Sequence, residues 1–524
     1  MPIEGGPLAG SPPHLDTILQ TGCEADPEAT AIVSSARKLT WRELDAASDA
    51  LALAYLDMGL EPGDRFASLM PNRVDLVLHY LACFKIGLVV TPLNYRYTPR
   101  EIDHALEVSE ARALLAHAER SDDVATSRVM PEVALGPVWC EGAGPGPSPR
   151  FEALVARGIT GKPRLERPEP SRPAGIFFTS GSTGPSKGVT HSCDTLRWMC
   201  ASAVAGLEFT RDDVCLPGSS MSHVGSFLWT FAALSVGARV VVARVLEAHE
   251  MIPLIRAQRP TFLAMLPAAL IALVRDHDLR PEDLASLRTC RCGSDKVSVE
   301  LLAEFSALAG FPIDEGYGMT EVGLVTVNPP SGMIKQGSIG KPVGGFALSI
   351  RDEDGSEVGA GTVGRIWIKS RSQMIGYWNA PEATEAVVRD GWLDSGDLAH
   401  ADAEDYVWFF GRKKQVIVHD GSNISPLEVE DALLEHPAIA LAGVVGIHDL
   451  VHGENVRAYV TLRPGHTRPK SDDVIAFCRE RIGYKAPEEI VVLDEMPLNP
   501  TGKVDRTGLK QLAEDHLHPA DDRR

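Results

Sequence analysis

The residues from Thr179 to Val189, TSGSTGPSKGV, place glycines and hydroxyl side chains around a single lysine, Lys187. They follow the apolar run GIFFTS, which predicts a strand, and precede a helical pattern from about His191. A strand, a Gly/Ser/Thr loop and a helix together offer backbone amides, hydroxyls and one cation to an oxyanion. A glycine-rich turn with an incidental lysine would give the same letters, so the loop alone leaves both interpretations open.

This loop differs from the Walker A loop of motor and switch ATPases. That motif needs serine or threonine directly after its lysine, whereas here Gly188 follows Lys187 and Ser186 precedes it. An ATPase of the motor or switch class is therefore disfavoured.

Four later segments also contain residue types that bind nucleotides, metals or phosphates. They are GYGMTE at 316–321, GWLDSGDLAH at 391–400, GRKKQVIV from 411 and PLNPTGKVDR at 497–506. Taken singly, they fit a turn with a glutamate, a turn with an aspartate, a solvated basic run and a surface lysine. No single segment decides between these interpretations and a functional one.

In this order, the five segments resemble the motifs of the adenylate-forming enzymes, which include acyl-CoA synthetases, coumarate-CoA ligases, firefly luciferase and peptide-synthetase adenylation domains. Their phosphate loop runs roughly [ST]-[ST]-G-[ST]-T-G-x-P-K-G, and Ser186 stands here in place of the proline. The resemblance extends from about residue 15 to about residue 512.

The resemblance implies a site for ATP, its product AMP and Mg²⁺. In the family, the tyrosine at Tyr317 stacks on adenine, Thr320 contacts the α-phosphate, Glu321 binds Mg²⁺, and Asp397 and Arg412 contact the ribose. The remaining nucleotide-binding positions that it implies are Thr179, Ser180, Gly181, Ser182, Thr183, Gly184, Lys187, Gly293, Ser294 and Gly318.

The resemblance also implies the chemistry and a moving domain. Lys414 falls at the family's hinge, and Lys503 at the lysine that swings in to contact the substrate carboxylate and the α-phosphate. His223 matches an aromatic or histidine position beside that carboxylate. The implied acyl pocket is lined by Val224, Ser226, Phe227, Gly316, Leu324 and Val325. These small and apolar side chains favour a hydrophobic acid, although a hydrophobic helix face would look alike.

One segment departs from the family pattern. Relatives carry a small-residue segment ending in proline beside the adenine, whereas this chain has Gly293-Ser294-Asp295-Lys296. The opposite charges of Asp295 and Lys296 could face solvent or could alter adenine or acyl recognition.

The composition restricts the partners. The 71 acidic and 51 basic residues give a net charge of −20, which disfavours nucleic acid and anionic membrane surfaces as partners. Nine scattered cysteines without zinc-like spacing predict reduced thiols. The first residues lack the basic start and apolar core of a signal peptide, so we expect a cytoplasmic protein, monomeric or homodimeric, without integral membrane segments.

The hydrophobic pattern predicts an α/β fold. Short β-rich runs alternate with amphipathic helices, which indicates helix-covered parallel or mixed sheets. Capping boxes are predicted at Thr40 and Ser425, and a helix cap at Ser471. We expect a large adenylation domain at 1–412, with a β-rich subdomain at 340–410, and a small α+β lid domain at 413–524.

The expected function is activation of a carboxylic acid, aryl or medium-chain, to acyl-AMP with release of pyrophosphate, followed by transfer to CoA. The motifs are shared by relatives that transfer the acyl group to an amine or to a carrier protein's pantetheine. A catalytically silent nucleotide-binding protein is disfavoured by the intact motif residues, and luciferase-like oxidation has no positive indication.

Overall fold

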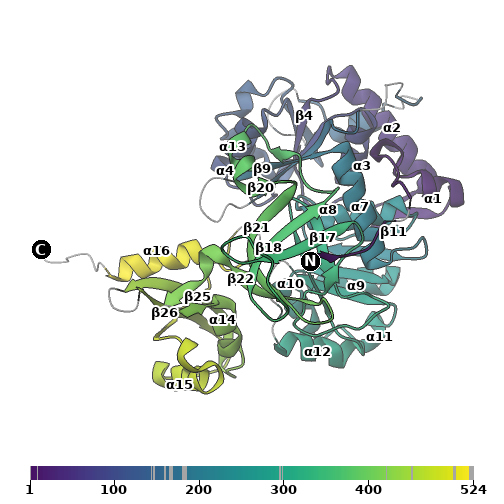
Figure 1. Cartoon of the computed structure of the whole chain (residues 1–524). Coiled ribbons are helices and arrows are strands. Elements are labelled where there is room, and N and C mark those ends of the chain that lie inside the picture. Colours follow the sequence, from purple (N-terminus) through teal and green to yellow (C-terminus); the bar gives the residue numbers. More distant parts are fainter. Residues whose placement is uncertain are drawn as a thin grey trace, which may run out of the picture.

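The described residues form four sheets. Figure 1 shows their arrangement in the computed structural model. The structure describes residues 2–8, 10–142, 144, 148–157, 161–163, 169–179, 186–293, 297, 299–419, 422–449, 453–499 and 503–517. The predicted mixed α/β class is confirmed.

Two of the sheets form the large part of the chain. The nine-stranded sheet has the order β16-β15-β14-β13-β12-β10-β11-β2-β3, over Lys341–Pro342, Gly323–Val327, Asp314–Met319, Thr289–Gly293, Phe262–Met265, Val214–Gly218, Arg239–Val242, Thr30–Ser34 and Lys38–Thr40. The seven-stranded sheet has the order β19-β9-β8-β5-β4-β6-β7, over Gly376–Tyr377, Lys187–Ser192, Pro173–Thr179, Val89–Pro92, Arg65–Leu69, Ala113–His117 and Pro137–Cys140. Their central strands are parallel, as the strand-helix alternation predicted.

A layer of helices joins these two sheets. α3 contacts β5 of one sheet and β2 of the other, and α7 contacts β8 and β9 on one side and β15 on the other. The helices of the large part are α1 (Gln20–Ala25), α2 (Trp41–Asp57), α3 (Val74–Lys85), α4 (Pro99–Ser109), α5 (Ser121–Ala125), α6 (Phe151–Val155), α7 (Cys193–Leu207), α8 (Val224–Ser235), α9 (Ala248–Gln258), α10 (Pro267–Val274), α11 (Pro281–Leu284), α12 (Val299–Ala309) and α13 (Pro381–Val387). This layer buries the largest apolar cluster of the chain.

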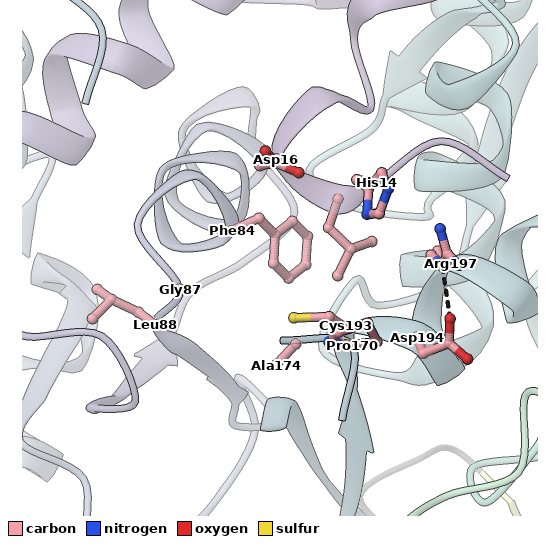
Figure 2. Close-up of a pocket in the computed structure, with 11 residues that line it drawn as sticks. His14, Asp16, Phe84, Gly87, Leu88, Pro170, Ala174, Cys193, Asp194 and Arg197 are labelled. Carbon is pink, nitrogen blue, oxygen red and sulfur yellow. Dashed lines mark hydrogen bonds and ion pairs between the residues drawn. The ribbon is translucent and has the colours of Figure 1, made fainter. Parts of the chain in front are cut away.

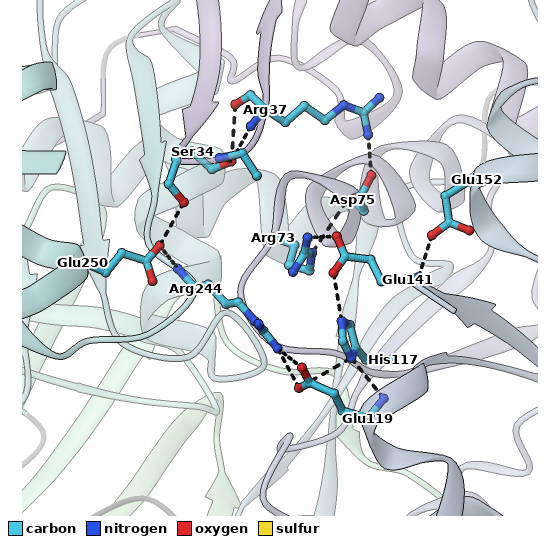
Figure 3. Close-up of polar contacts among 12 residues, drawn as sticks. Ser34, Arg37, Arg73, Asp75, His117, Glu119, Glu141, Glu152, Arg244 and Glu250 are labelled. Atoms are coloured by element: carbon cyan, nitrogen blue, oxygen red, sulfur yellow. Dashed lines mark hydrogen bonds and ion pairs between the residues drawn. The ribbon is translucent and has the colours of Figure 1, made fainter. Parts of the chain in front are cut away.

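Polar contacts also link the two sheets where their strands end (Figure 3). Arg244, just after β11, contacts both Glu119 oxygens at 2.5 and 2.6 Å, and Glu119 follows β6 of the other sheet. Arg37, between β2 and β3, pairs with Asp75 on α3. These contacts fix the relative position of these strand ends.

The smaller sheets follow along the chain. β1 (Ile3–Glu4), β17 (Phe346–Arg351), β18 (Gly364–Ser370), β21 (Trp392–Ala401), β20 (Val388–Arg389) and β22 (Val407–Arg412) form a six-stranded sheet. β24 (Ser422–Ile424), β23 (Ile417–His419), β26 (Gly453–Leu462), β25 (Ile439–Asp449) and β27 (Glu489–Val492) form a five-stranded sheet with α14 (Pro426–Leu434), α15 (Ser471–Ile482) and α16 (Arg506–Leu517). The expected domain boundary at residue 413 falls directly after β22, and the five-stranded part stands apart in Figure 1.

The predicted helix caps have different outcomes. Thr40 and Glu43 form the predicted capping box of α2. Ser425 is the N-cap residue of α14 and Pro426 its first residue, as predicted, but the capping box does not form, because the Ser425 hydroxyl donates to the Phe410 carbonyl at 2.5 Å. The prediction for Ser471 is wrong, because Ser471 is already the first residue of α15. Tertiary contacts compete with local caps for the same hydroxyl.

All nine cysteines are free thiols, as predicted, and seven of them are buried. None of the helices in the described ranges is both long and apolar enough to cross a lipid bilayer.

Candidate active site

Three of the predicted nucleotide-binding side chains contact one another. The Tyr317 hydroxyl donates to Asp397 Oδ2 at 2.6 Å, and Arg412 Nε lies 3.4 Å from Asp397 Oδ1. Asp397 on β21 is the register partner of Arg412 on β22, so the strand pairing itself brings these two side chains together. Burial raises the pKa of Asp397, and the Arg412 guanidinium, the Tyr317 hydroxyl and the Lys503 ammonium oppose that shift.

The Tyr317 ring lies on Phe409 in a stacked arrangement, with 6.0 Å between centroids. The ring comes from β14 at a bulge with β15, where Gly318 follows. A Cβ at Gly318 would lie only 2.5 Å from the Gly323 carbonyl oxygen, so this turn requires glycine.

The predicted Mg²⁺ ligand, Glu321, is held by a tyrosine that sequence reasoning missed. Glu321 is 8% exposed, and the Tyr377 hydroxyl donates to its Oε1 at 2.9 Å. Burial raises the pKa of Glu321, and the bond from Tyr377 opposes that shift. The Lys187 ammonium lies 4.9 Å from the centre of the Tyr377 ring. Tyr377 thus connects the phosphate-loop lysine with the predicted metal ligand.

A buried histidine fixes the backbone beside Glu321. His191 Nε2 donates to the Thr320 carbonyl at 2.8 Å, and Thr195 Oγ1 lies 3.2 Å from His191 Nδ1. Burial lowers the pKa of His191 to about 4, so the ring is neutral at neutral pH. The Thr320 side chain therefore projects from a turn whose backbone is tied to β9.

The charge of Lys503 acts on two other predicted site residues. Its ammonium affects the pKa of both Asp397 and His223, while its backbone N–H donates to Asn499 Oδ1 at 3.1 Å. Burial first, and the Lys503 charge second, lower the pKa of His223 to about 4. His223 Nε2 lies 3.4 Å from Asn94 Nδ2. The turn that carries Lys503 therefore brings a cation whose field reaches both the ribose-contacting side and the start of α8.

The predicted acyl-pocket residues fall into two groups. Val224 and Gly316 are half-buried, whereas Ser226, Phe227, Leu324 and Val325 are buried. The Ser226 hydroxyl contacts Ser219 Oγ at 2.5 Å, and the Phe227 ring packs among Tyr80, Phe84, Phe177 and Phe231. Phe227, Leu324 and Val325 thus pack in the large apolar cluster, whereas Val224 and Gly316 are more accessible.

The phosphate loop joins two strands, which corrects the predicted strand-loop-helix order. Lys187 begins β9, which pairs antiparallel with β8, and α7 starts only at Cys193. A helix N-terminus therefore does not follow the loop directly. The Ser186 carbonyl accepts a hydrogen bond from His104 Nε2 of α4 at 2.8 Å.

Some predicted residues lie outside the described residues: Ser180, Gly181, Ser182, Thr183, Gly184, Ser294, Asp295 and Lys296. Thr179 ends β8, Gly293 ends β13 opposite Gly316, and Lys414 lies in a 3-10 turn at Lys413–Gln415, directly after β22.

The described residues fit a divalent cation held mainly by its nucleotide. Among them, no group of three or more His, Cys, Asp or Glu side chains is placed to hold a metal, and the predicted ligand, Glu321, would supply one hard carboxylate. Mg²⁺ often takes one or two carboxylates and completes its shell with phosphates and water.

Sequence reasoning missed Tyr377, Asn94 and Arg291. Arg291 interrupts an apolar strand, TCRCG, and is 5% exposed beside Gly316. A charged residue at a buried strand position was an available signal for this residue, because such groups are rarely buried without a partner. Nothing comparable marks Tyr377, which becomes informative only through its contact with Glu321.

A hollow of ≈ 410 Å³, open to solvent, lies elsewhere, beside the N-terminal segment and the start of α7 (Figure 2). Its lining includes His14, Asp16, Phe84, Cys193 and Arg197, and none of its residues belongs to the predicted site.

Comparison with known proteins agrees with this geometry. The AMP-binding enzyme family matches residues 19–378, and the AMP-binding enzyme C-terminal domain matches residues 428–503. The chain is 33% identical over 498 residues to an indoleacetate–CoA ligase of Aromatoleum aromaticum, covering 93% of this chain and 96% of that one. It is 30% identical over 514 residues to a fatty acid–[acyl-carrier-protein] ligase of Streptomyces coeruleorubidus, covering 95% and 96%.

A solved structure shares the same fold. The o-succinylbenzoate CoA synthetase of Bacillus subtilis, in complex with its acyl-adenylate intermediate, has a TM-score of 0.83 at 28% identity, over 94% of this chain and 98% of that one. With both domains matched over most of the chain, the protein belongs to the AMP-binding enzyme family and is an adenylate-forming ligase.

Proposed function

We propose that the protein uses ATP and Mg²⁺ to convert a hydrophobic carboxylic acid, aryl or medium-chain, to acyl-AMP and pyrophosphate, and then forms an acyl-CoA thioester. The observation that carries this proposal is the contact of Tyr317 and Arg412 with Asp397, a carboxylate on which the Lys503 charge also acts. Lys503 would be the cation that contacts a carboxylate and an α-phosphate at once. CoA as acceptor is supported by the indoleacetate–CoA ligase among the relatives.

The first half-reaction brings two anions together. Carboxylate oxygen attacks the α-phosphorus, and pyrophosphate leaves with the electron pair of the broken P–O bond. Lys503 offsets the charge on the attacking side, and Lys187 does so on the pyrophosphate side. Bound Mg²⁺ would neutralise phosphate charge and would be held by Glu321, which Tyr377 orients. Asp397 and Arg412 would hold the ribose, so that the α-phosphate faces His223.

His223 is a neutral neighbour of the reacting carboxylate in this proposal. Because burial and Lys503 lower its pKa to about 4, its ring carries no charge near pH 7. It can therefore donate one hydrogen bond without competing with Lys503 for the carboxylate.

Transfer to another acceptor is the second candidate, because a relative that is 30% identical is a fatty acid–[acyl-carrier-protein] ligase. In both cases a thiol attacks the acyl carbon and AMP leaves. Lys414, directly after β22, is the proposed pivot that would withdraw Lys503 and open the site to that thiol.

Pyrophosphate exchange across a panel of carboxylic acids tests the first step. We expect exchange with aryl and medium-chain acids and little with acetate, then a thioester by mass spectrometry when CoA is added. Amide formation with added amines, without any thioester, would exclude the CoA assignment but keep adenylation. Absence of exchange with every acid would contradict the proposal itself.

A further inference from the structure

Arg291 is a buried cation that the proposed mechanism does not use. It lies on β13 between Cys290 and Cys292, which both point into the apolar cluster beneath α10 and α12. Because side chains alternate along a strand, Arg291 points to the opposite face, towards α8. Its Nη1 donates to Asp314 Oδ2 on β14 at 2.9 Å, and both side chains are at most 6% exposed.

The two other nitrogen atoms of this guanidinium carry further N–H donors. Among the described residues, Nε and Nη2 of Arg291 have no hydrogen-bond acceptor, although the residue is 5% exposed. Neither atom is among the buried polar side-chain atoms that lack a partner, so both keep some contact with solvent and can donate to a group that enters from there. Asp314 is already engaged, because it also accepts from the backbone and side-chain N–H groups of Asn328, each at 3.3 Å.

The spare donors face space kept open by glycine. A Cβ at Gly316 would lie 1.6 Å from Arg291 Nη2, so the guanidinium covers the surface where a side chain would stand. The Trp229 ring of α8 lies over it, 5.9 Å from Arg291 Cζ. Gly225, one turn before Trp229, and Gly293, opposite Gly316, are half-buried and also lack side chains. α8 and the ends of β13 and β14 thus carry little side-chain bulk on this side of Arg291, where its spare donors reach solvent.

This space starts beside the residue proposed to meet the carboxylate. His223 immediately precedes α8, and Trp229 lies six residues further along the chain. A rise of 1.5 Å per residue separates the two by about 9 Å along the helix. An acid whose carboxyl group lies at His223 would therefore bring its far end to Arg291 if it has about the length of an arylpropenoic acid.

We propose that Arg291 is a specificity-determining residue that donates hydrogen bonds to an oxygen atom at the far end of the acid. The substrate class is then an oxygenated aryl acid, with a hydroxyl, ether or carbonyl group, and not a plain hydrocarbon. A neutral acceptor fits better than a second carboxylate, because Asp314 already balances the charge of Arg291 and an added anion would be buried unpaired. This inference rests on the proposed adenylation of an acid.

Paired acids test this inference on the unmodified protein. Pyrophosphate exchange is compared for cinnamic and 4-hydroxycinnamic acid, for benzoic and 4-methoxybenzoic acid, and for the dicarboxylate 4-carboxycinnamic acid. We expect kcat/KM to be about tenfold higher for the oxygenated member of at least one pair, because the acceptor satisfies buried donors. Equal or better use of the hydrocarbon member in both pairs, or preference for the dicarboxylate, would overturn the inference and leave adenylation standing.

A double variant tests the residue itself. Arg291→Met with Asp314→Asn removes both charges and keeps an amide oxygen for Asn328, so no unpaired charge is buried. We expect the oxygenated and hydrocarbon acids of each pair to be used equally. Arg275→Met with Glu304→Gln makes the same change at an exposed pair and should keep the preference. A preference that persists in the folded double variant would contradict the role of Arg291, and if that variant does not fold, the paired acids still decide. Absence of exchange with every acid contradicts the proposed function instead.

Discussion

The ribose-contacting end of the site and its acyl end differ in how their polar groups are satisfied. At the first, Tyr317, Asp397 and Arg412 already contact one another, so an invariant nucleotide meets side chains held in place. At the second, Arg291 keeps spare donors over a glycine-lined space. The side chains that would bind the nucleotide are therefore preorganised, whereas the donors proposed to recognise the acid gain their acceptor only when the acid binds.

Lys503 is the cation proposed to contact both reactants, and its removal should have the largest effect. Lys503→Ala is expected to slow adenylate formation by about 10²–10³-fold, because one preorganised cation is lost. Transfer from preformed acyl-AMP to the acceptor should be unaffected. Single-turnover assays of each half-reaction measure this, with Lys510→Ala on the exposed face of α16 as control. An equal loss in both half-reactions would contradict a role of Lys503 in adenylate formation alone.

Asp397→Asn should act on the nucleotide end alone. The amide loses the charge that pairs with Arg412 and accepts more weakly from ribose hydroxyls, so KM for ATP should rise about tenfold or more. KM for the acid should stay within about twofold. The same change at the exposed turn residue Asp405 provides the control. A matching rise in KM for the acid would show that the two ends are not independent.

Tyr377→Phe should have a smaller effect, limited to the Mg²⁺ dependence of the reaction. The ring that Lys187 approaches is kept, but the donor to Glu321 is lost. The Mg²⁺ concentration that gives half-maximal exchange should rise by about fivefold, as expected for the loss of one hydrogen bond with a net contribution of about 1 kcal/mol. Titration of Mg²⁺ at saturating ATP measures it, and Tyr484→Phe, at a 63% exposed ring, is the control. An unchanged Mg²⁺ requirement would show that Tyr377 does not support Mg²⁺ binding.

The burial of His223, at the acyl end, should be detectable through the pH dependence of the free energy of unfolding. The folded pKa of His223 is about 4, and an unfolded histidine titrates near 6.5. Below pH 6.5 the unfolded state therefore binds a proton that the folded state does not, so stability falls as pH drops from about 6.5 to about 4. His223→Gln should reduce that slope, by at most about 1.4 kcal/mol per pH unit. Urea unfolding at pH 7 and pH 5 tests it, and an unchanged slope would contradict a buried neutral ring. The exposed His466→Gln is the control.

Ser186→Pro should have the smallest effect. Proline keeps the carbonyl that accepts from His104 and restricts the backbone, whereas the hydroxyl contact with Tyr97 is lost. These effects oppose each other, so KM for ATP should change by less than about threefold. Exchange kinetics measure it, and a larger change in either direction would show that the loop depends on this residue.

Candidate site residues could be predicted from the sequence where they lie in a short, recognisable motif. Tyr317, Glu321, Asp397, Arg412, Lys187 and Lys503 were all named from short segments, and the structure brings them to one region. Arg291 and Tyr377 could not be assigned in this way, because their roles depend on strand register and on contacts across 23 and 56 positions of the chain. The failed caps at Ser425 and Ser471 have a similar origin, since distant carbonyls compete with the helix for the hydroxyl.

The nine free cysteines have a practical consequence for assays of the second step. Burial raises the pKa of the Cys193 and Cys478 thiols to about 11 and of the Cys200 thiol to about 12, and it raises those of Cys23, Cys83, Cys140, Cys215 and Cys290 as well. Thiols react with disulfide reagents as thiolates, and these side chains hold very little thiolate near pH 8. Consumption of free CoA can therefore be followed by colorimetric thiol titration of the folded protein with little background from its own sulfur atoms.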